Sequence, residues 1–173
     1  MTRARTNGRR LLRGLAILVS LVLLADSARP QDENAPPGRF ELAVYAGEFG
    51  VINRLGLYEI DLELRLPAWR YCLRPIAGAA LIENGGFFGY LGLRAEIPLS
   101  ERFYIAPSTG LGFYEQSAYD LGGPFEIRNA LELGWRPTPR TSVGVGMSHL
   151  SNGGVYDQNP GLETAYVSLG FSF

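Results

Sequence analysis

From residue 40 to the end of the chain, apolar and polar residues alternate with a period of two, which is the side-chain spacing of a β-strand. The clearest run is 58–66, where Tyr, Ile and Leu occupy the even positions and Glu, Asp or Arg the odd ones. The other runs of this kind are 40–49, 70–82, 87–97, 102–114, 125–136, 141–150 and 164–173. Their lengths, roughly 9–13 residues, are those of strands that cross a bilayer at a tilt.

Two architectures fit eight such runs: a soluble β-sandwich and a closed barrel in a membrane. The positions expected to face inward mix charged side chains, such as Glu63 and Arg94, with glycines, such as Gly110 and Gly144. This mixture suits a small barrel, whose lumen is filled by side chains, whereas a sandwich core needs apolar residues. The chain also ends in Leu169–Phe173, whose alternating apolar residues and terminal aromatic resemble the C-terminal signal of outer-membrane proteins. The sequence therefore predicts an all-β fold, an eight-stranded antiparallel transmembrane β-barrel of the bacterial outer membrane.

The connections between the runs predict how the barrel is oriented. Short connections that contain proline follow the second, fourth and sixth runs, at 67–69, 98–101 and 136–140. Longer polar connections are expected after the first, third, fifth and seventh runs, notably 115–124 and 151–161. Outer-membrane barrels have short periplasmic turns and longer extracellular loops. Both termini are therefore predicted in the periplasm, and the seventh strand should meet the eighth at the outer leaflet.

The first 39 residues are predicted to lie outside the barrel domain, 40–173. Residues 1–28 contain five arginines, an apolar run at 15–25 and small residues up to Ala28, which is the order of segments in a secretory signal peptide. The apolar run is too short for a membrane anchor, because a spanning helix needs about 20 residues. Residues 29–39 are predicted to form a short polar tail.

Composition narrows the chemistry further. A net charge of −1 argues against a protein that binds nucleic acid through its phosphates. A single cysteine excludes an intrachain disulfide framework and a cysteine-rich zinc or iron–sulfur site. Composition therefore predicts no nucleic-acid partner and no cysteine-based metal site, and no other metal or cofactor is expected.

One polar cluster falls on a face that is otherwise apolar. In the seventh run, Val145 and Met147 set the parity of the lipid-facing side, and His149 and Ser151 continue it. In the eighth run, the lipid-facing parity extends back to Glu163. Such residues can serve as base, nucleophile and orienting acid, but polar residues near the headgroups also cost little free energy. From the residues alone, an esterase site and mere interfacial decoration both remain open.

The residues around this cluster resemble a known family. Residues 148–154 (Ser-His-Leu-Ser-Asn-Gly-Gly) and 159–163 (Asn-Pro-Gly-Leu-Glu) are similar to the motif of the PagL-type lipid A 3-O-deacylases. Those proteins are eight-stranded outer-membrane barrels that hydrolyse the ester-linked acyl chain at the 3-position of lipid A. The resemblance implies Ser151 as the nucleophile, His149 as the base and Glu163 as the orienting acid. It also implies an oxyanion site from Asn152 and the Gly154 backbone amide.

The resemblance further implies an enzyme that acts on the lipid A of lipopolysaccharide in the outer leaflet, without metal or nucleotide. Its location would be the bacterial outer membrane, which the chain would cross several times. Two other functions stay open: a non-catalytic structural or adhesion-type barrel, and a lipid A acyltransferase whose acceptor is a hydroxyl instead of water. A homo-oligomer is also left open.

Overall fold

The computed structural model describes residues 39–69, 72–115 and 119–173, and the predicted signal peptide, 1–28, and the tail up to residue 38 lie outside the described residues. The strands are β1 (Glu41–Phe49), β2 (Leu57–Arg65), β3 (Leu73–Ile82), β4 (Gly86–Ala95), β5 (Ile97–Pro98), β6 (Phe103–Glu115), β7 (Phe125–Thr138), β8 (Thr141–Ser151) and β9 (Leu162–Ser172). A short 3-10 helix, η1 (Glu83–Gly85), lies between β3 and β4. Within the described residues, no helix is long and apolar enough to span a bilayer.

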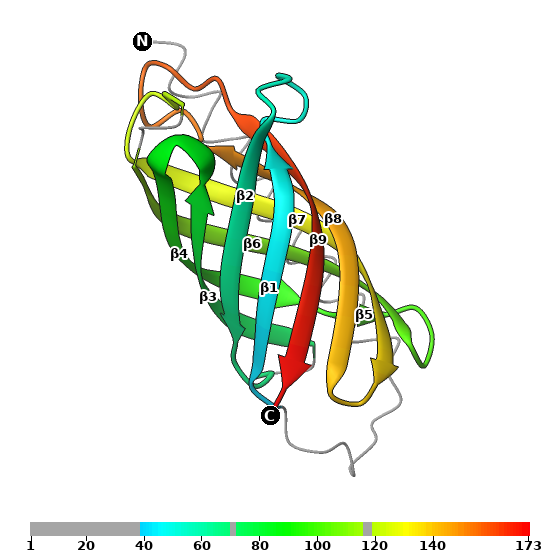
Figure 1. Ribbon diagram of the computed structural model, residues 1–173. Coiled ribbons are helices and arrows are strands. Elements are labelled where there is room, and N and C mark those ends of the chain that lie inside the picture. The colour runs from blue at the N-terminus through cyan, green and yellow to red at the C-terminus, as the bar shows by residue number, and fades with distance from the viewer. Residues whose placement is uncertain (1–38, 70–71, 116–118) are drawn as a thin grey trace.

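The strands form one closed antiparallel barrel (Figure 1). Consecutive long strands pair with each other, and β1 pairs with β9, which joins the two ends of the chain's barrel domain. The two-residue β5 pairs with β6 in the same register as β4 does, so it extends β4 beyond Glu96. The eight-stranded barrel is therefore confirmed. Its N- and C-terminal ends lie at one rim, where Phe173 N donates to Phe40 O at 2.9 Å; the opposite rim is called the distal rim below.

The alternation in the sequence corresponds to the outside and the inside of the barrel. Many large apolar side chains of the strands are exposed on the outer surface, including Val44, Ile60, Leu62, Leu81, Leu91, Leu111, Leu131, Leu133, Val145, Val167 and Leu169. Soluble monomers rarely expose a continuous apolar surface of this extent. A barrel in a membrane needs such a surface, because these side chains contact lipid.

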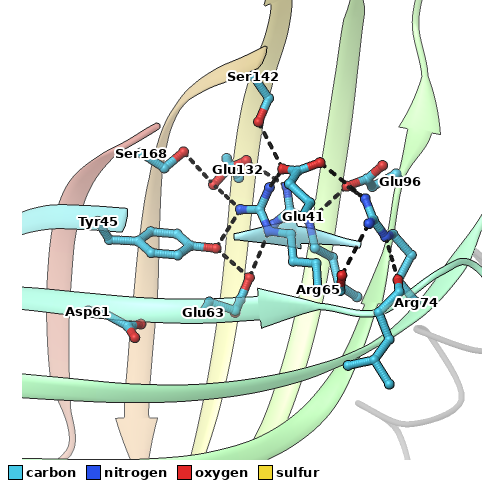
Figure 2. A network of polar contacts seen from close by, with 12 residues as sticks. Glu41, Tyr45, Asp61, Glu63, Arg65, Arg74, Glu96, Glu132, Ser142 and Ser168 are labelled. Carbon is cyan, nitrogen blue, oxygen red and sulfur yellow. Dashed lines mark hydrogen bonds and ion pairs between the residues drawn. The ribbon is translucent and has the colours of Figure 1, made fainter. Parts of the chain in front are cut away.

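Paired charges fill the lumen near the rim that carries the termini. Arg65 forms ion pairs with Glu41 and Glu63, and its Nε lies 2.9 Å from Glu63 Oε1. Arg94 Nη2 donates to Glu132 Oε1 at 2.6 Å. Figure 2 shows the side chains of this network converging from several strands around Arg65. A buried charge is tolerated only when it is paired and hydrogen-bonded, so these side chains must fold together as a unit.

The distal half of the lumen combines a buried apolar cluster with the buried side chains of Glu126 and Arg128. The sequence predicted charged side chains and glycines at the inward positions, and did not predict this apolar cluster. The buried cluster there includes Phe49, Phe88, Tyr114, Leu121, Leu150 and Leu162. Parity separates inward from outward positions, but it does not say how the inward residues are distributed along the barrel axis. This apolar cluster supports the ends of β8 and β9 from inside.

The third connection is shorter than predicted. It is the three-residue segment Glu83–Gly85, in which Asn84 and Gly85 have φ of 69° and 91°. An Asn-Gly pair with positive φ at both residues closes a tight hairpin. The prediction of a longer loop at this point was therefore wrong.

The other connections follow the predicted alternation only in the second half of the chain. There the connections 99–102 and 139–140 are short, whereas 116–124 and 152–161 at the distal rim are long. In the first half, the connection 66–72 is as long as 50–56. Pro67 lies within this segment and Pro75 near the start of β3, and proline cannot donate to a strand ladder.

Candidate active site

His149 and Glu163 form a pair on the outside of the barrel at the distal rim. They are direct partners in the β8–β9 ladder, and His149 Nδ1 lies 3.0 Å from Glu163 Oε1. The exposed fractions of the two side chains are 45% and 26%. Their outward direction follows the pleat, because Met147 and Val167 on the same faces are also exposed. A carboxylate at Nδ1 orients the imidazole and leaves Nε2 available as a base.

Ser151 lies beside this pair as the last residue of β8, two positions after His149 on the same face. Its partner on β7 is Ile127. The hydrogen bond between His149 and Glu163 is formed. Among the described residues, no hydrogen bond joins Ser151 to His149. Catalytic hydrogen bonds often tighten only when substrate binds.

In the described part of the chain, no three His, Cys, Asp or Glu side chains lie close enough together to hold a metal ion.

The outward residues at the level of His149 are polar across four strands. Asn129 on β7 is the ladder partner of His149, and Thr109 on β6 is the partner of Asn129. Thr109 Oγ1 donates to Asn129 Oδ1 at 3.0 Å. Neither residue is among the candidates predicted from the sequence, although Asn129 interrupts the apolar outward series between Ile127 and Leu131. The site therefore extends to β6 along the lipid-facing surface.

Backbone groups hold the acid and the base in place. Gly50 N and Val51 N donate to Glu163 O at 2.9 and 3.1 Å, so the β1–β2 connection supports the acid. Gly161 packs against the base with φ of 68°, and a Cβ at this position would lie 2.8 Å from His149 Cε1. Glycine adopts this conformation at no steric cost. Gly161 therefore supplies both the turn and the space that the imidazole occupies.

The side chain of Asn152 is committed to other backbone groups. It is fully buried, and its Nδ2 donates to Leu121 O at 2.9 Å and to Gln158 O at 2.8 Å. Its Oδ1 accepts from Gly154 N at 2.9 Å. An amide nitrogen carries two hydrogens, so both donors of Asn152 are in use, as is the Gly154 N–H. The donors of Asn152 and Gly154 are thus engaged within the protein in this structure, and their role in an oxyanion site stays a prediction.

An apolar groove of about 710 Å³ runs along the outer surface beside the pair. Its lining includes Ala46, Leu131, Val145, Met147, Ala165 and Val167. Met147 lies two residues before His149 on β8. Ala165 lies two residues after Glu163 on β9. The groove therefore adjoins the site on the side toward the rim of the termini, and it crosses the outer surface from β1 to β6.

Comparison with known proteins decides the family. Residues 61–172, which are more than half of the chain, match the sequence pattern of the family described as "Lipid A 3-O-deacylase (PagL)". The chain belongs to the PagL family. The matched span contains all five residues that the motif had indicated: His149, Ser151, Asn152, Gly154 and Glu163.

Individual PagL proteins and other barrels are similar to the chain over different lengths. The lipid A deacylase PagL of Bordetella bronchiseptica is 28% identical over 93 residues, which cover 49% of this chain and 52% of that protein. The chain thus spans about half the length of this relative. The crystal structure of the outer membrane enzyme PagL has a TM-score of 0.63 at 18% identity, covering 77% of this chain and 99% of the other. A de novo designed transmembrane β-barrel has a TM-score of 0.61 at 12% identity, covering 80% and 98%.

The structural similarities establish the fold, and the PagL family gives it a location. The closed barrel and its apolar outer surface suit a membrane. Membership of the PagL family supports the outer membrane as that membrane. The outward polar residues Thr109, Asn129, His149 and Glu163 are then open to lipid. On β6, the exposed Leu111 and Phe113 lie on the distal side of Thr109.

Proposed function

We propose that this chain is an outer-membrane serine esterase that hydrolyses the ester-linked acyl chain at the 3-position of lipid A, in the outer leaflet of a bacterial cell. The observation that carries the proposal is the His149–Glu163 hydrogen bond on the lipid-facing surface, with Ser151 on the same face of β8. The PagL family supplies the substrate class, lipid A. An ester near the headgroup boundary can meet this site without leaving the leaflet.

Each member of the proposed triad has one task. Ser151 Oγ attacks the ester carbonyl carbon, and His149 Nε2 takes the hydroxyl proton. His149 then gives this proton to the departing sugar oxygen, and the acyl chain remains on Ser151 as an ester. Water attacks this ester with His149 again as the base, which releases the fatty acid and restores the serine. Glu163 holds Nδ1 and stabilises the charged imidazole at each step.

The oxyanion that forms in both steps needs an N–H donor. The Asn152 side chain would have to give up a bond to Leu121 O or Gln158 O to serve as this donor. The Gly154 N–H has a single acceptor, Asn152 Oδ1. A small rotation of the Gly153–Gly154 backbone would release it, and both glycines have positive φ that few other residues adopt. We therefore favour Gly154 as the donor.

The apolar groove is the proposed site for the acyl chain. The chain leaves one apolar environment, the leaflet, for another, so burial in the groove contributes little hydrophobic free energy. What the groove can add is orientation, because a chain held along Met147 and Ala165 brings its ester to the level of Ser151. Correct orientation of the reacting groups is itself a large part of catalysis.

Mass spectrometry of lipid A from cells that express the chain tests this function. Loss of one 3-hydroxyacyl group with the wild type, and intact lipid A with Ser151→Ala, is the expected result. Gain of an acyl chain would instead identify an acyltransferase. Unchanged lipid A with a folded wild-type barrel would support a structural or adhesion-type protein.

A further inference from the structure

The β6–β7 connection, of which residues 119–124 are described, packs against the β8–β9 connection, 152–161, and Asn152 lies buried between them. Its amide bridges Leu121 O of the first connection and Gln158 O of the second. The backbone N–H of Asn152 donates to Asn159 Oδ1 at 3.1 Å. Leu121 itself is fully buried in the distal apolar cluster. Asn152 thus ties its own connection to the β6–β7 connection.

Two glycines of the β6–β7 connection make this contact close. A Cβ at Gly122 would lie 2.1 Å from Gln158 O, and one at Gly123 would lie 2.0 Å from the ring of Tyr156. The N–H of Phe125 also donates to Tyr156 Oη at 3.3 Å. A side chain at Gly122 would meet the backbone of Gln158 and force the two connections apart, and one at Gly123 would displace the Tyr156 ring. The backbones are therefore fitted to one another over several residues.

This contact adjoins the last residue of β8. Ser151 is held by the ladder on one side, through Ile127, and the chain leaves the sheet at Asn152. Strand ends open more readily than strand interiors, because fewer hydrogen bonds hold them. The direction of the Ser151 side chain therefore depends on what holds the next residue.

We propose that Asn152 is a positioning residue, which latches the β8–β9 connection to residues 119–124 and so aims Ser151 at His149. The proposal rests on the function proposed above for Ser151. It gives the buried amide a structural task in place of contact with the substrate. It also extends the machinery of the site to the β6–β7 connection, which carries none of the motif residues.

The test compares variants of the purified, folded barrel by two readouts. Asn152→Asp keeps the size and one acceptor but loses both amide donors, and Gly122→Ala wedges the connections apart. Gly56→Ala is the matched control for the latter, because Gly56 has a positive φ of 66° but no atom within 4 Å of its added Cβ. Gly122 also has a positive φ, of 92°. Gly122→Ala and Gly56→Ala therefore both strain the backbone, but only Gly122→Ala disturbs the contact between the two connections.

Hydrogen–deuterium exchange is the readout that does not depend on activity. In Asn152→Asp, amides of 119–124 and of 152–161 should both exchange about tenfold faster than in the wild type. Those of 50–56 should keep their rate. Unchanged exchange in 119–124 would overturn the latch. This result stands even if the wild type releases no acyl chain, an outcome that would refute the proposed function instead.

The kinetic readout separates positioning from direct contact. Asn152→Asp and Gly122→Ala should each lower kcat about tenfold with little change in KM, because misplaced groups slow the chemical step. Gly56→Ala should match the wild type. If both variants act through the latch, the double variant should be no slower than the slower single one. Multiplied losses would identify Asn152 as an independent contributor, such as an oxyanion donor, and would contradict the proposal.

Discussion

Gly161 lies so close to the imidazole of His149 that a single added methyl group should disable the site. A Cβ at this position would lie 2.8 Å from Cε1 and 3.4 Å from Nε2 of the ring. Carbon atoms in ordinary contact are about 3.5 Å apart or more, so in Gly161→Ala the ring would have to retreat by about 0.7 Å. A shift approaching 1 Å in an active site can lower the rate about 100-fold. We expect kcat to fall between about 10- and 100-fold.

Backbone strain is the second effect of this substitution, and it can be separated from the first. An alanine held at positive φ costs about 1 kcal/mol of folding free energy. Gly161 has φ of 68° and Gly56 has φ of 66°, so the same strain applies to Gly56→Ala. The control, however, adds its methyl group in open space. Only Gly161→Ala should lose activity, while the two variants should lose similar stability.

The assay is release of fatty acid from purified lipid A by detergent-solubilised barrels, with initial rates taken over a range of substrate concentrations. Folding is checked by the change in gel mobility on heating, and stability by urea titration. If Gly161→Ala retained a kcat within about threefold of Gly56→Ala, a displaced imidazole would not matter. His149 would then not be the base in this reaction.

Three further predictions address the lumen, the groove and the orientation. Replacing Arg65 by Met leaves buried carboxylates without their partner, so the free energy of unfolding should fall by about 3–5 kcal/mol; a loss below about 1 kcal/mol in urea titration would show that the network is not needed. Ala165→Leu narrows the groove, so kcat/KM for long acyl chains relative to short ones should fall about tenfold, and an unchanged ratio in a chain-length series would remove the groove from the site. In intact cells, a membrane-impermeant thiol reagent should label Asp120→Cys and not Thr138→Cys, since these exposed residues lie at opposite rims and Cys72 is buried. The reverse labelling would put the site in the inner leaflet, away from lipid A.

The period of two was sufficient to predict the barrel and the direction of the site residues. The structure confirms that His149 and Glu163 point outward with the exposed Met147 and Val167. This works because one buried face and one lipid-facing face impose opposite polarity on alternate residues. The Asn-Gly pair at 84–85 also carries a sequence signal for a tight hairpin.

Other features depend on contacts between distant segments, which local patterns do not reveal. The amide of Asn152 is engaged by Leu121 O, 31 residues away, so its partners could not be read from its motif. The ladder partners Asn129 and His149 are 20 residues apart and meet only through the register of β7 and β8. The placement of the buried apolar cluster in the distal half of the lumen likewise follows from the stagger of strands around the barrel.

Hydrolysis of lipid A by Ser151→Ala, measured beside the wild type, tests the central claim most directly. The substitution removes one hydroxyl from the barrel surface, so the free energy of unfolding should change by less than about 0.5 kcal/mol. Fatty acid release by the folded variant should fall at least about 1000-fold, because a serine triad has no second nucleophile. His149→Ala should be nearly as severe and Glu163→Ala milder. A folded Ser151→Ala barrel that kept more than about a tenth of the wild-type rate would contradict the account.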